Sequence, residues 1–212
     1  EVGAMMFMEE GIRMETGTGG GIFKGLKRML TGDGFFICTF YNSANVKRCV
    51  SFGAPYPGKI IALDLQQVGG TFICQKDSFL CAANGIDIDI AFTKRMGAGL
   101  FGGEGFILQR LSGDGLAFVH AGGMIIKREL RHGETLRVDT GCIVAMAPTV
   151  DYDIQFVGGF KNALFGGEGM FLASLTGPGT IYLQSLPLSR LADRIVSSSH
   201  GSRVESRGIG GI

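Results

Sequence analysis

One long stretch of this chain is repeated without a gap 64 residues further along. GLFGGEGFILQRLSGDGLAFVHA at 99–121 aligns with ALFGGEGMFLASLTGPGTIYLQS at 163–185, and FICQKDSFLCAANGIDIDI at 72–90 aligns with LRVDTGCIVAMAPTVDYDI at 136–154. A shorter third echo of the repeat, GIFKGLKRMLTGDGFFICTF at 21–40, contains only the end of the repeated unit. In it, MLTGDGFF aligns with RLSGDGLA of the first copy and with SLTGPGTI of the second. Repetition at a fixed period indicates one supersecondary unit that was copied and packed against itself.

Strand signals dominate the chain. Short runs such as KIIALDL, MIIKREL and CIVAMA are rich in β-branched and apolar residues and are bounded by Gly, Asp or Asn. Turn signals recur at GDG 32–34, GDG 113–115 and GPG 177–179. With about ten residues per strand and turn, the pattern predicts an all-β fold with minimal helix, either a β-sandwich or a double-stranded β-helix-like body built from internal β repeats.

The repeats also predict the domain organisation. No linker-like stretch separates the copies, so we expect a single domain over residues 1–195. Its units are a divergent first one at about 3–71, a second at 72–135 and a third at 136–195. We expect the polar, Gly-rich residues 196–212 to form a mobile tail.

Helix signals are confined to two short segments. IFKGLKRML at 22–30 has the length of two turns, and so does LSRLADRI at 188–195. In the second segment, Pro187 and Ser189 are typical of a helix start, and one apolar face is formed by Leu188, Leu191, Ala192 and Ile195.

Composition limits the classes of partner and compartment. A formal net charge of +1 gives no whole-molecule attraction to nucleic acid, and we expect none to be bound. The five cysteines have no CxxC spacing and most lie in apolar runs, which favours reduced thiols and a cytoplasmic location. No run approaches the roughly 18–20 apolar residues of a membrane span. The opening EVGAMMFMEEG lacks the basic start of a signal peptide.

Two motifs resemble known functional signatures but lack the context that these require. GAPYPGKI at 53–60 satisfies GxxxxGK, yet Pro55 and Pro57 remove backbone donors, and Ile60 stands where a phosphate-binding loop has a hydroxyl. A turn before a strand is the favoured interpretation. LRVDTG at 136–141 resembles the DTG of aspartic proteases, but the repeat supplies no second aspartate, so we interpret it as a strand that ends in a turn.

The alternation within the repeats predicts which side chains point inward. We expect the aligned pairs Phe79/Ile143, Ile86/Val150, Ile88/Tyr152 and Ile90/Ile154 to face the core. The aspartates on the opposite strand face, Asp87, Asp89, Asp151 and Asp153, are expected to be solvated, although a carboxylate site for Ca²⁺ or Mg²⁺ is the alternative.

No catalytic constellation emerges from the sequence. His120, His132 and His200 are far apart, and none has a second ligand at metal-binding spacing. The Ser and Cys residues lack an elbow motif or a neighbouring base. We therefore predict a protein that is not an enzyme and that has no cofactor and no metal.

The LFGGEG motif is the remaining candidate site. The glycines beside its Leu–Phe pair have no side chains that could cover these two apolar residues. Each copy is therefore either an apolar tip that enters a membrane or a partner, or a tight corner whose Phe fills the core. Duplication favours the corner. As candidate partner or membrane loops we name the following residues: Leu100, Phe101, Glu104, Leu164, Phe165 and Glu168.

Several linked motifs resemble those of one known family. GIFKGLKRMLTGDGFF, PYPGKIIALDL, LFGGEGF with LSGDG, LRVDTGCIVA and VDYDIQFVGGFKNALFGGEG resemble the altered inheritance of mitochondria protein 24 family, in its bacterial branch, from about Gly3 to about Leu186. The resemblance implies a fold similar to the tryptophan RNA-binding attenuation protein, a body of repeated β units. It also implies an additional strand segment before the GAMM stretch, so that Glu1 would lie within a strand.

The same resemblance carries the functional expectation. It implies no established enzymatic activity, and the mitochondrial members are associated with inner-membrane organisation. We expect a structural or assembly protein, or a membrane-associated scaffold peripheral to the inner membrane. We also expect a homo-oligomer such as a trimer or a higher ring. An RNA-binding ring is the alternative, although the strongest basic cluster holds only Lys24, Lys27 and Arg28.

Overall fold

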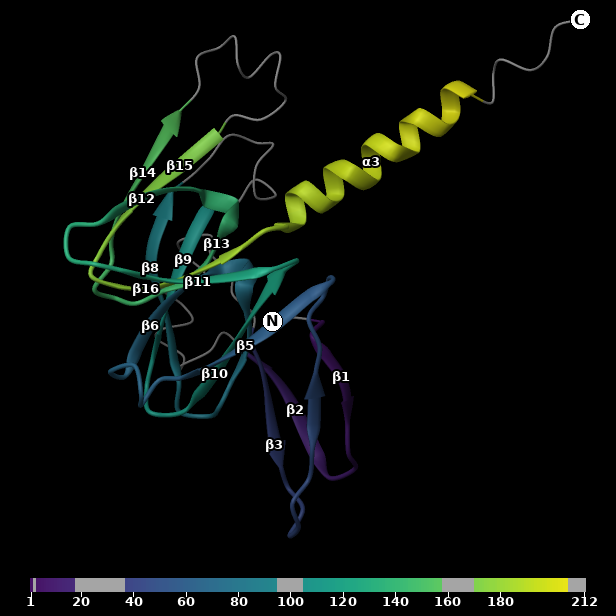
Figure 1. Ribbon diagram of the computed structural model, residues 1–212. Helices are drawn as coiled ribbons and strands as arrows, with labels where there is room; N and C mark the ends of the chain where they lie inside the picture. The colour runs from purple at the N-terminus through teal and green to yellow at the C-terminus, as the bar shows by residue number, and fades with distance from the viewer. Residues whose placement is uncertain (2, 18–36, 95–104, 158–169, 206–212) are drawn as a thin grey trace, which may run out of the picture.

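The computed structural model describes residues 1, 3–17, 37–94, 105–157 and 170–205 (Figure 1). Within these residues the chain consists of short antiparallel strands arranged in several sheets, together with one α-helix and short 3-10 turns. The predicted all-β fold with little helix is confirmed. The expected helix at 22–30 lies outside the described residues.

The middle of the chain forms a complete structural unit. It contains seven strands or turns in the order β6 (Thr71–Gln75), η1 (Lys76–Ser78), β7 (Phe79–Ala82), β8 (Asp87–Lys94), β9 (Phe106–Ser112), β10 (Leu116–Gly122) and β11 (Ile125–Leu130). Strand β9 pairs with β6 on one side and with β8 on the other, whereas β10 pairs with β7.

The next unit repeats this order. Its elements are β12 (Thr135–Asp139), η3 (Thr140–Cys142), β13 (Ile143–Met146), β14 (Asp151–Val157), β15 (Met170–Thr176) and β16 (Gly179–Gln184). Its β12–β15 and β13–β16 ladders have the registers of the β6–β9 and β7–β10 ladders. Thr71 faces Ser112 in the β6–β9 pair, and Thr135 faces Thr176 in the β12–β15 pair, so both residues are shifted by 64. Even the irregularity between Phe118 and Val119 recurs in the β13–β16 ladder.

The N-terminal part of the chain follows the same plan. Its strands are β1 (Met5–Met8), β2 (Ile12–Gly17), β3 (Ile37–Asn42), β4 (Val50–Phe52) and β5 (Gly58–Asp64). In the β1–β4 ladder, Met5, Phe7 and Met8 face Phe52, Ser51 and Val50, the register and irregularity that the β7–β10 ladder also has. Strand β1 is therefore the counterpart of β7 and β13, and β4 is the counterpart of β10 and β16.

This correspondence corrects one sequence alignment. The echo at 21–40 placed FFICTF beside LAFVHA, which forms β10. In the structure β3 pairs with β2, as β9 pairs with β8, so β3 is the counterpart of β9. The alignment was wrong because a turn signal of the GDG type carries no information about which of two adjacent strands follows it.

Neighbouring units are joined by strands of one unit that pair with a strand of the next. Strand β5 follows the first unit but pairs with β10 of the second, and β11 follows the second unit but pairs with β16 of the third. In addition, β13 of the third unit pairs with β6 of the second, with Ala145 opposite Cys74 and Met146 opposite Ile73. Each unit therefore relies on its neighbour to complete its sheets.

Two hydrophobic clusters form the core of the described residues. One combines β5, β7 and β10 side chains with Val144 and Ala145 of β13. The other is centred on the third unit and takes Phe106, Leu108 and Leu130 from the second. Neither cluster contains a buried residue from before Leu63. The first unit thus contributes strands to the fold without a core cluster of its own among these residues.

The inward positions follow the sequence pattern closely. Phe79, Ile143, Val150 and Ile154 are buried in the clusters, and Ile86, Ile88 and Tyr152 pack against them. Ile90 is half-buried and belongs to neither cluster. The ladder shifts register between Ile90 and Phe92, and such a bulge re-aims side chains near it.

The C-terminal helix is longer than the sequence suggests. Helix α3 runs from Leu188 to Glu205, whereas two turns over 188–195 were expected and residues from 196 onward were assigned to a tail. The stretch VSSSHGSRVE has no apolar periodicity, which is why the pattern gave no helix there. Figure 1 shows α3 projecting away from the strands.

Candidate functional site

The six LFGGEG residues named from the sequence cannot be placed. Leu100, Phe101, Glu104, Leu164, Phe165 and Glu168 all lie outside the described residues. The choice between an apolar tip and a structural corner therefore stays a prediction.

The two aspartate pairs lie on the solvent side of their strands. Asp87 and Asp89 on β8 are exposed, and so are Asp151 and Asp153 on β14. Asp153 accepts a hydrogen bond from the Gln155 amide, 2.6 Å away. In the part of the chain that the structure describes, no group of three or more His, Cys, Asp or Glu residues is placed to hold a metal ion.

The two motifs with incomplete context have structural roles. Residues 53–57 form a loop that leads into β5, which confirms the turn before a strand. In LRVDTG, β12 ends at Asp139 and a 3-10 turn follows. The Asp139 carboxylate accepts a bond from the Gly141 N–H at 2.9 Å and pairs with Arg190 of α3 at 2.6 Å, so it fixes this turn and the start of the helix.

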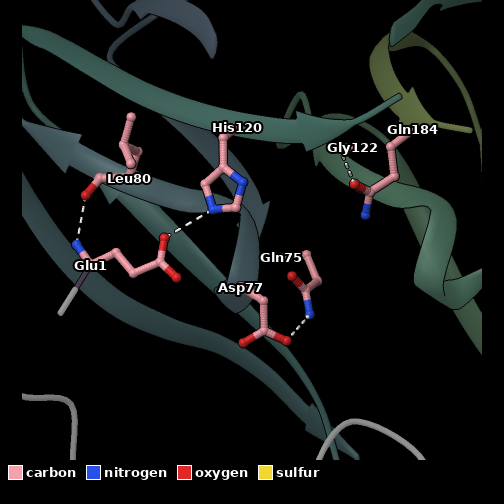
Figure 2. Close-up of polar contacts among 7 residues, drawn as sticks. All are labelled: Glu1, Gln75, Asp77, Leu80, His120, Gly122 and Gln184. Atoms are coloured by element: carbon pink, nitrogen blue, oxygen red, sulfur yellow. Dashed lines mark hydrogen bonds and ion pairs between the residues drawn. The ribbon is translucent and has the colours of Figure 1, made fainter. Parts of the chain in front are cut away.

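A buried polar cluster lies around His120, a residue that the sequence gave no reason to prefer over the other histidines. His120 is fully buried on β10, and its Nε2 lies 2.9 Å from the Glu1 carboxylate (Figure 2). The Tyr56 ring packs edge-on against the imidazole, with the centroids 4.9 Å apart. The Glu1 nitrogen donates to the Leu80 carbonyl of β7. Through Glu1, the beginning of the described chain is attached to the second unit.

The surroundings of this cluster keep Tyr56 protonated. Desolvation raises the pKa of the Tyr56 phenol to about 12, and the nearby Asp77 and Glu1 carboxylates act in the same direction. Asp77 in turn accepts a bond from the Gln75 amide at 3.0 Å. The cluster therefore consists of the neutral Tyr56 phenol, the His120 imidazole and the carboxylates of Glu1 and Asp77.

The repeat provides a comparison for His120. Its counterpart, 64 residues on, is Gln184, whose Oε1 accepts from the Gly122 N–H and whose Nε2 donates to the Gly141 carbonyl, both at 2.8 Å. Both residues thus tie a strand to a neighbouring segment, Gln184 through two bonds and His120 through Glu1. His120 Nδ1 and Ser78 Oγ have no hydrogen-bond partner among the described residues. We interpret the cluster as an anchor for the first unit.

The most distinctive surface is the apolar strand β1. All four of its side chains are exposed, with Met6 at 68% and Phe7 at 56%. Met14 on β2 and Tyr41 on β3, which form a separate sheet, are exposed as well. Contiguous exposed apolar groups on a folded protein mark an interaction surface. We call Met5–Met8 the β1 surface.

Burial at equivalent positions shows that the exposure of β1 is unusual within the fold. On β13 the counterparts of Met5, Phe7 and Met8 are Ile143, Ala145 and Met146, which are all about 1% exposed. Strand β6 covers β13, whereas among the described residues β1 pairs with β4 alone. The β1 surface therefore has the composition of a buried strand without the neighbour that buries it.

A second exposed apolar group lies on α3. Leu188 and Ile195 of the predicted apolar face are exposed, as is Val196, and Leu191 is half-buried. Within the described residues, no helix has the length and apolarity needed to cross a membrane.

The cysteines are free thiols in differing environments. Burial raises the pKa of the Cys74 thiol to about 12 and also raises the pKa values of Cys81 and Cys142. Cys49 is exposed. None of the three shifted thiols has the lowered pKa of a reactive cysteine.

Fold and surface together define a class, an all-β protein of serially repeated units with an exposed apolar strand at its first unit. Residues 1–186 match the family described as Mitochondrial biogenesis AIM24, and this chain belongs to that family.

Two relatives from Streptococcus pyogenes support this assignment. An uncharacterised protein of serotype M6 is 29% identical over 198 residues, which cover 90% of this chain and 77% of that protein. The crystal structure of another protein of this species superposes with a TM-score of 0.73 at 26% identity, covering 92% of this chain and 86% of the other.

Proposed function

We propose that this protein is a non-enzymatic assembly protein that works as a homo-oligomer. The observation that carries the proposal is the β1 surface, four apolar side chains exposed on a strand whose counterpart in the third unit is completely buried. Burying such side chains is worth roughly 1.5–3 kcal/mol each, so exposure in a lone chain is costly.

The family description agrees with this proposal, because it names mitochondrial biogenesis, a building process, and not a reaction. Two polar contacts between distant segments hold parts of the described chain together. Asp139 and Arg190 fasten α3, and Glu1 and His120 fasten the first unit. These interactions maintain the shape of a subunit.

The test is the mass of the purified chain in solution, measured by light scattering over a wide range of concentrations. An assembly protein should have a mass that is a multiple of 22.5 kDa and falls on dilution. A mass of 22.5 kDa at every concentration contradicts the proposal.

Two further assays distinguish a self-assembling scaffold from other partners. Pelleting with anionic liposomes tests a scaffold peripheral to a membrane, which the β1 surface or the exposed face of α3 could contact. Retention of bulk RNA at about 0.15 M salt, lost at higher salt, would instead support the RNA-binding alternative.

A further inference from the structure

Strand β12 has one edge that no strand of the described residues pairs with, whereas both edges of its counterpart β6 are paired. Strand β6 pairs with β9 on one side and with β13 on the other. Its counterpart β12 pairs with β15, and within the described ranges its other edge has no partner strand. Unpaired backbone N–H and C=O groups on a strand edge are a template for another strand.

The strand that belongs on such an edge is defined by the repeat. The edge of β6 is occupied by β13, so the edge of β12 should accept a strand of the same type. The chain has three strands of this type, β1, β7 and β13. Strand β13 is already paired with β6, and the side chains of β7 are buried or half-buried. Strand β1 remains, and it is the exposed one.

We propose that β1 of one copy pairs antiparallel with β12 of a second copy, in the register that β13 and β6 have within the chain. Ala145 faces Cys74, and their counterparts are Phe7 and Val138. Met146 faces Ile73, and their counterparts are Met8 and Arg137. This inference specifies the interface of the proposed assembly and therefore rests on the proposed function.

A second copy is required because β1 and β12 of one chain are remote from each other. Figure 1 shows β1 at one end of the molecule and β12 near the other, with the second unit between them. The contact uses two different surfaces, so it is head-to-tail. Such contacts close into a ring when the rotation between subunits allows closure.

The side chains at the interface suit this arrangement. Val138 is buried in the core cluster of the third unit, and Phe7 opposite it is apolar and exposed. Arg137 is exposed, and the aliphatic stem of an arginine can cover an apolar neighbour such as Met8 while its guanidinium stays in water. The ladder would therefore bury β1 without burying a charge.

Cysteine cross-linking tests the interface and its register. In a background that carries Cys38→Ser and Cys49→Ser, the double variant Phe7→Cys with Val138→Cys should form an intermolecular disulfide on mild oxidation, because paired strand positions lie within disulfide range. A non-reducing gel should show a ladder of multimers. Mixing the two single variants should give dimers alone, which excludes a link within one chain.

The repeat supplies an internal control for geometry. Ala145→Cys should form an intrachain disulfide with the native Cys74, its partner in the equivalent ladder. A Phe7→Cys and Leu136→Cys pair, displaced by two residues, should cross-link poorly. If Val138→Cys unfolds the chain, as judged by circular dichroism, Met8→Cys with Arg137→Cys tests the same register at exposed positions.

The outcomes distinguish failure of the β1–β12 interface from failure of the proposed function. An assembly that scatters as a multimer but fails to cross-link, while the Ala145→Cys control closes, overturns the β1–β12 interface and leaves the proposed function standing. Cross-linking of Phe7→Cys alone indicates a two-fold contact of β1 with itself and also overturns the interface. A wild-type mass of one chain at every concentration overturns both.

Discussion

Met8 and Met146 occupy equivalent positions in two copies of one ladder, opposite Val50 and Ile181, yet Met146 is 1% exposed and Met8 is 41% exposed. Because the two side chains are identical, the difference in exposure reflects the surroundings of each strand, and Met146 packs in a core cluster. Beside β13 lies β6 of the preceding unit. The missing neighbour of β1 is the central point of this account.

Truncating the two methionines should have different consequences. Met146→Ala leaves a cavity in a packed cluster and should lower the free energy of unfolding by about 2–5 kcal/mol. Met8→Ala should change the stability of a dilute chain by about 0.5 kcal/mol or less, as at other surface sites. Urea unfolding at low protein concentration measures both values.

The assembly should respond in the opposite way. Met8→Ala should lower the multimer fraction in light scattering at concentrations where the wild type assembles, since it removes buried apolar area. Unchanged assembly in both Met8→Ala and Phe7→Ala would argue against a role for the β1 surface.

Gly122 should tolerate no side chain, because an added Cβ would lie 2.0 Å from the Leu186 carbonyl oxygen. Gly122→Ala therefore forces the backbone of two segments apart, at a cost of about 1–3 kcal/mol or more. Gly17→Ala is the matched control, since nothing lies within 4 Å of its added Cβ. Equal thermal midpoints for the two variants would contradict the close approach seen at Gly122.

His120 should be replaceable by the residue that its counterpart uses. His120→Ala leaves the Glu1 carboxylate without its partner and opens space beside Tyr56, at a cost on the order of 1–3 kcal/mol. His120→Gln keeps a donor and follows Gln184, so it should cost less. If both variants lose the same stability, packing of the imidazole is the dominant contribution and the hydrogen bond to Glu1 is not.

The buried Cys74 thiol should make stability fall at alkaline pH. Its pKa is raised from 9.0 to about 12 in the folded chain, so the unfolded chain releases this proton first as the pH rises. The unfolding free energy should therefore decline from about pH 9 upward and be insensitive to this group below that pH. Wild type should lose more stability than Cys74→Ala between pH 9 and 11, and parallel curves would contradict this assignment.

The sequence predicted the second and third units well because each copy independently supports the other. The correspondence of the elements in the two units and the inward positions Phe79 and Ile143 follow directly from the 64-residue alignment. A pattern seen twice removes most of the ambiguity between strand and helix in short apolar runs.

In the first unit, strands β1 and β4 were missed for a physical reason. Met5–Met8 lacks the β-branched residues that mark strands, and β4 has only three residues, so neither gives a strong local signal. Their strand character comes from pairing with each other across a long connection, and tertiary pairing is invisible to local propensity. The same applies to His120, whose partner Glu1 is 119 residues away.

Amide hydrogen exchange at Met8 tests the central claim most directly. Consecutive N–H groups of a strand point to opposite edges, and the Glu9 N–H donates to the Cys49 carbonyl on the β4 side, so the Met8 N–H points to the open edge of β1. In the assembled protein the Met8 amide should be protected to a degree that approaches that of Met146, because a strand of a second copy lies beside β1, and this protection should disappear on dilution to single chains. Rapid exchange at Met8 under conditions in which light scattering shows multimers would contradict the account.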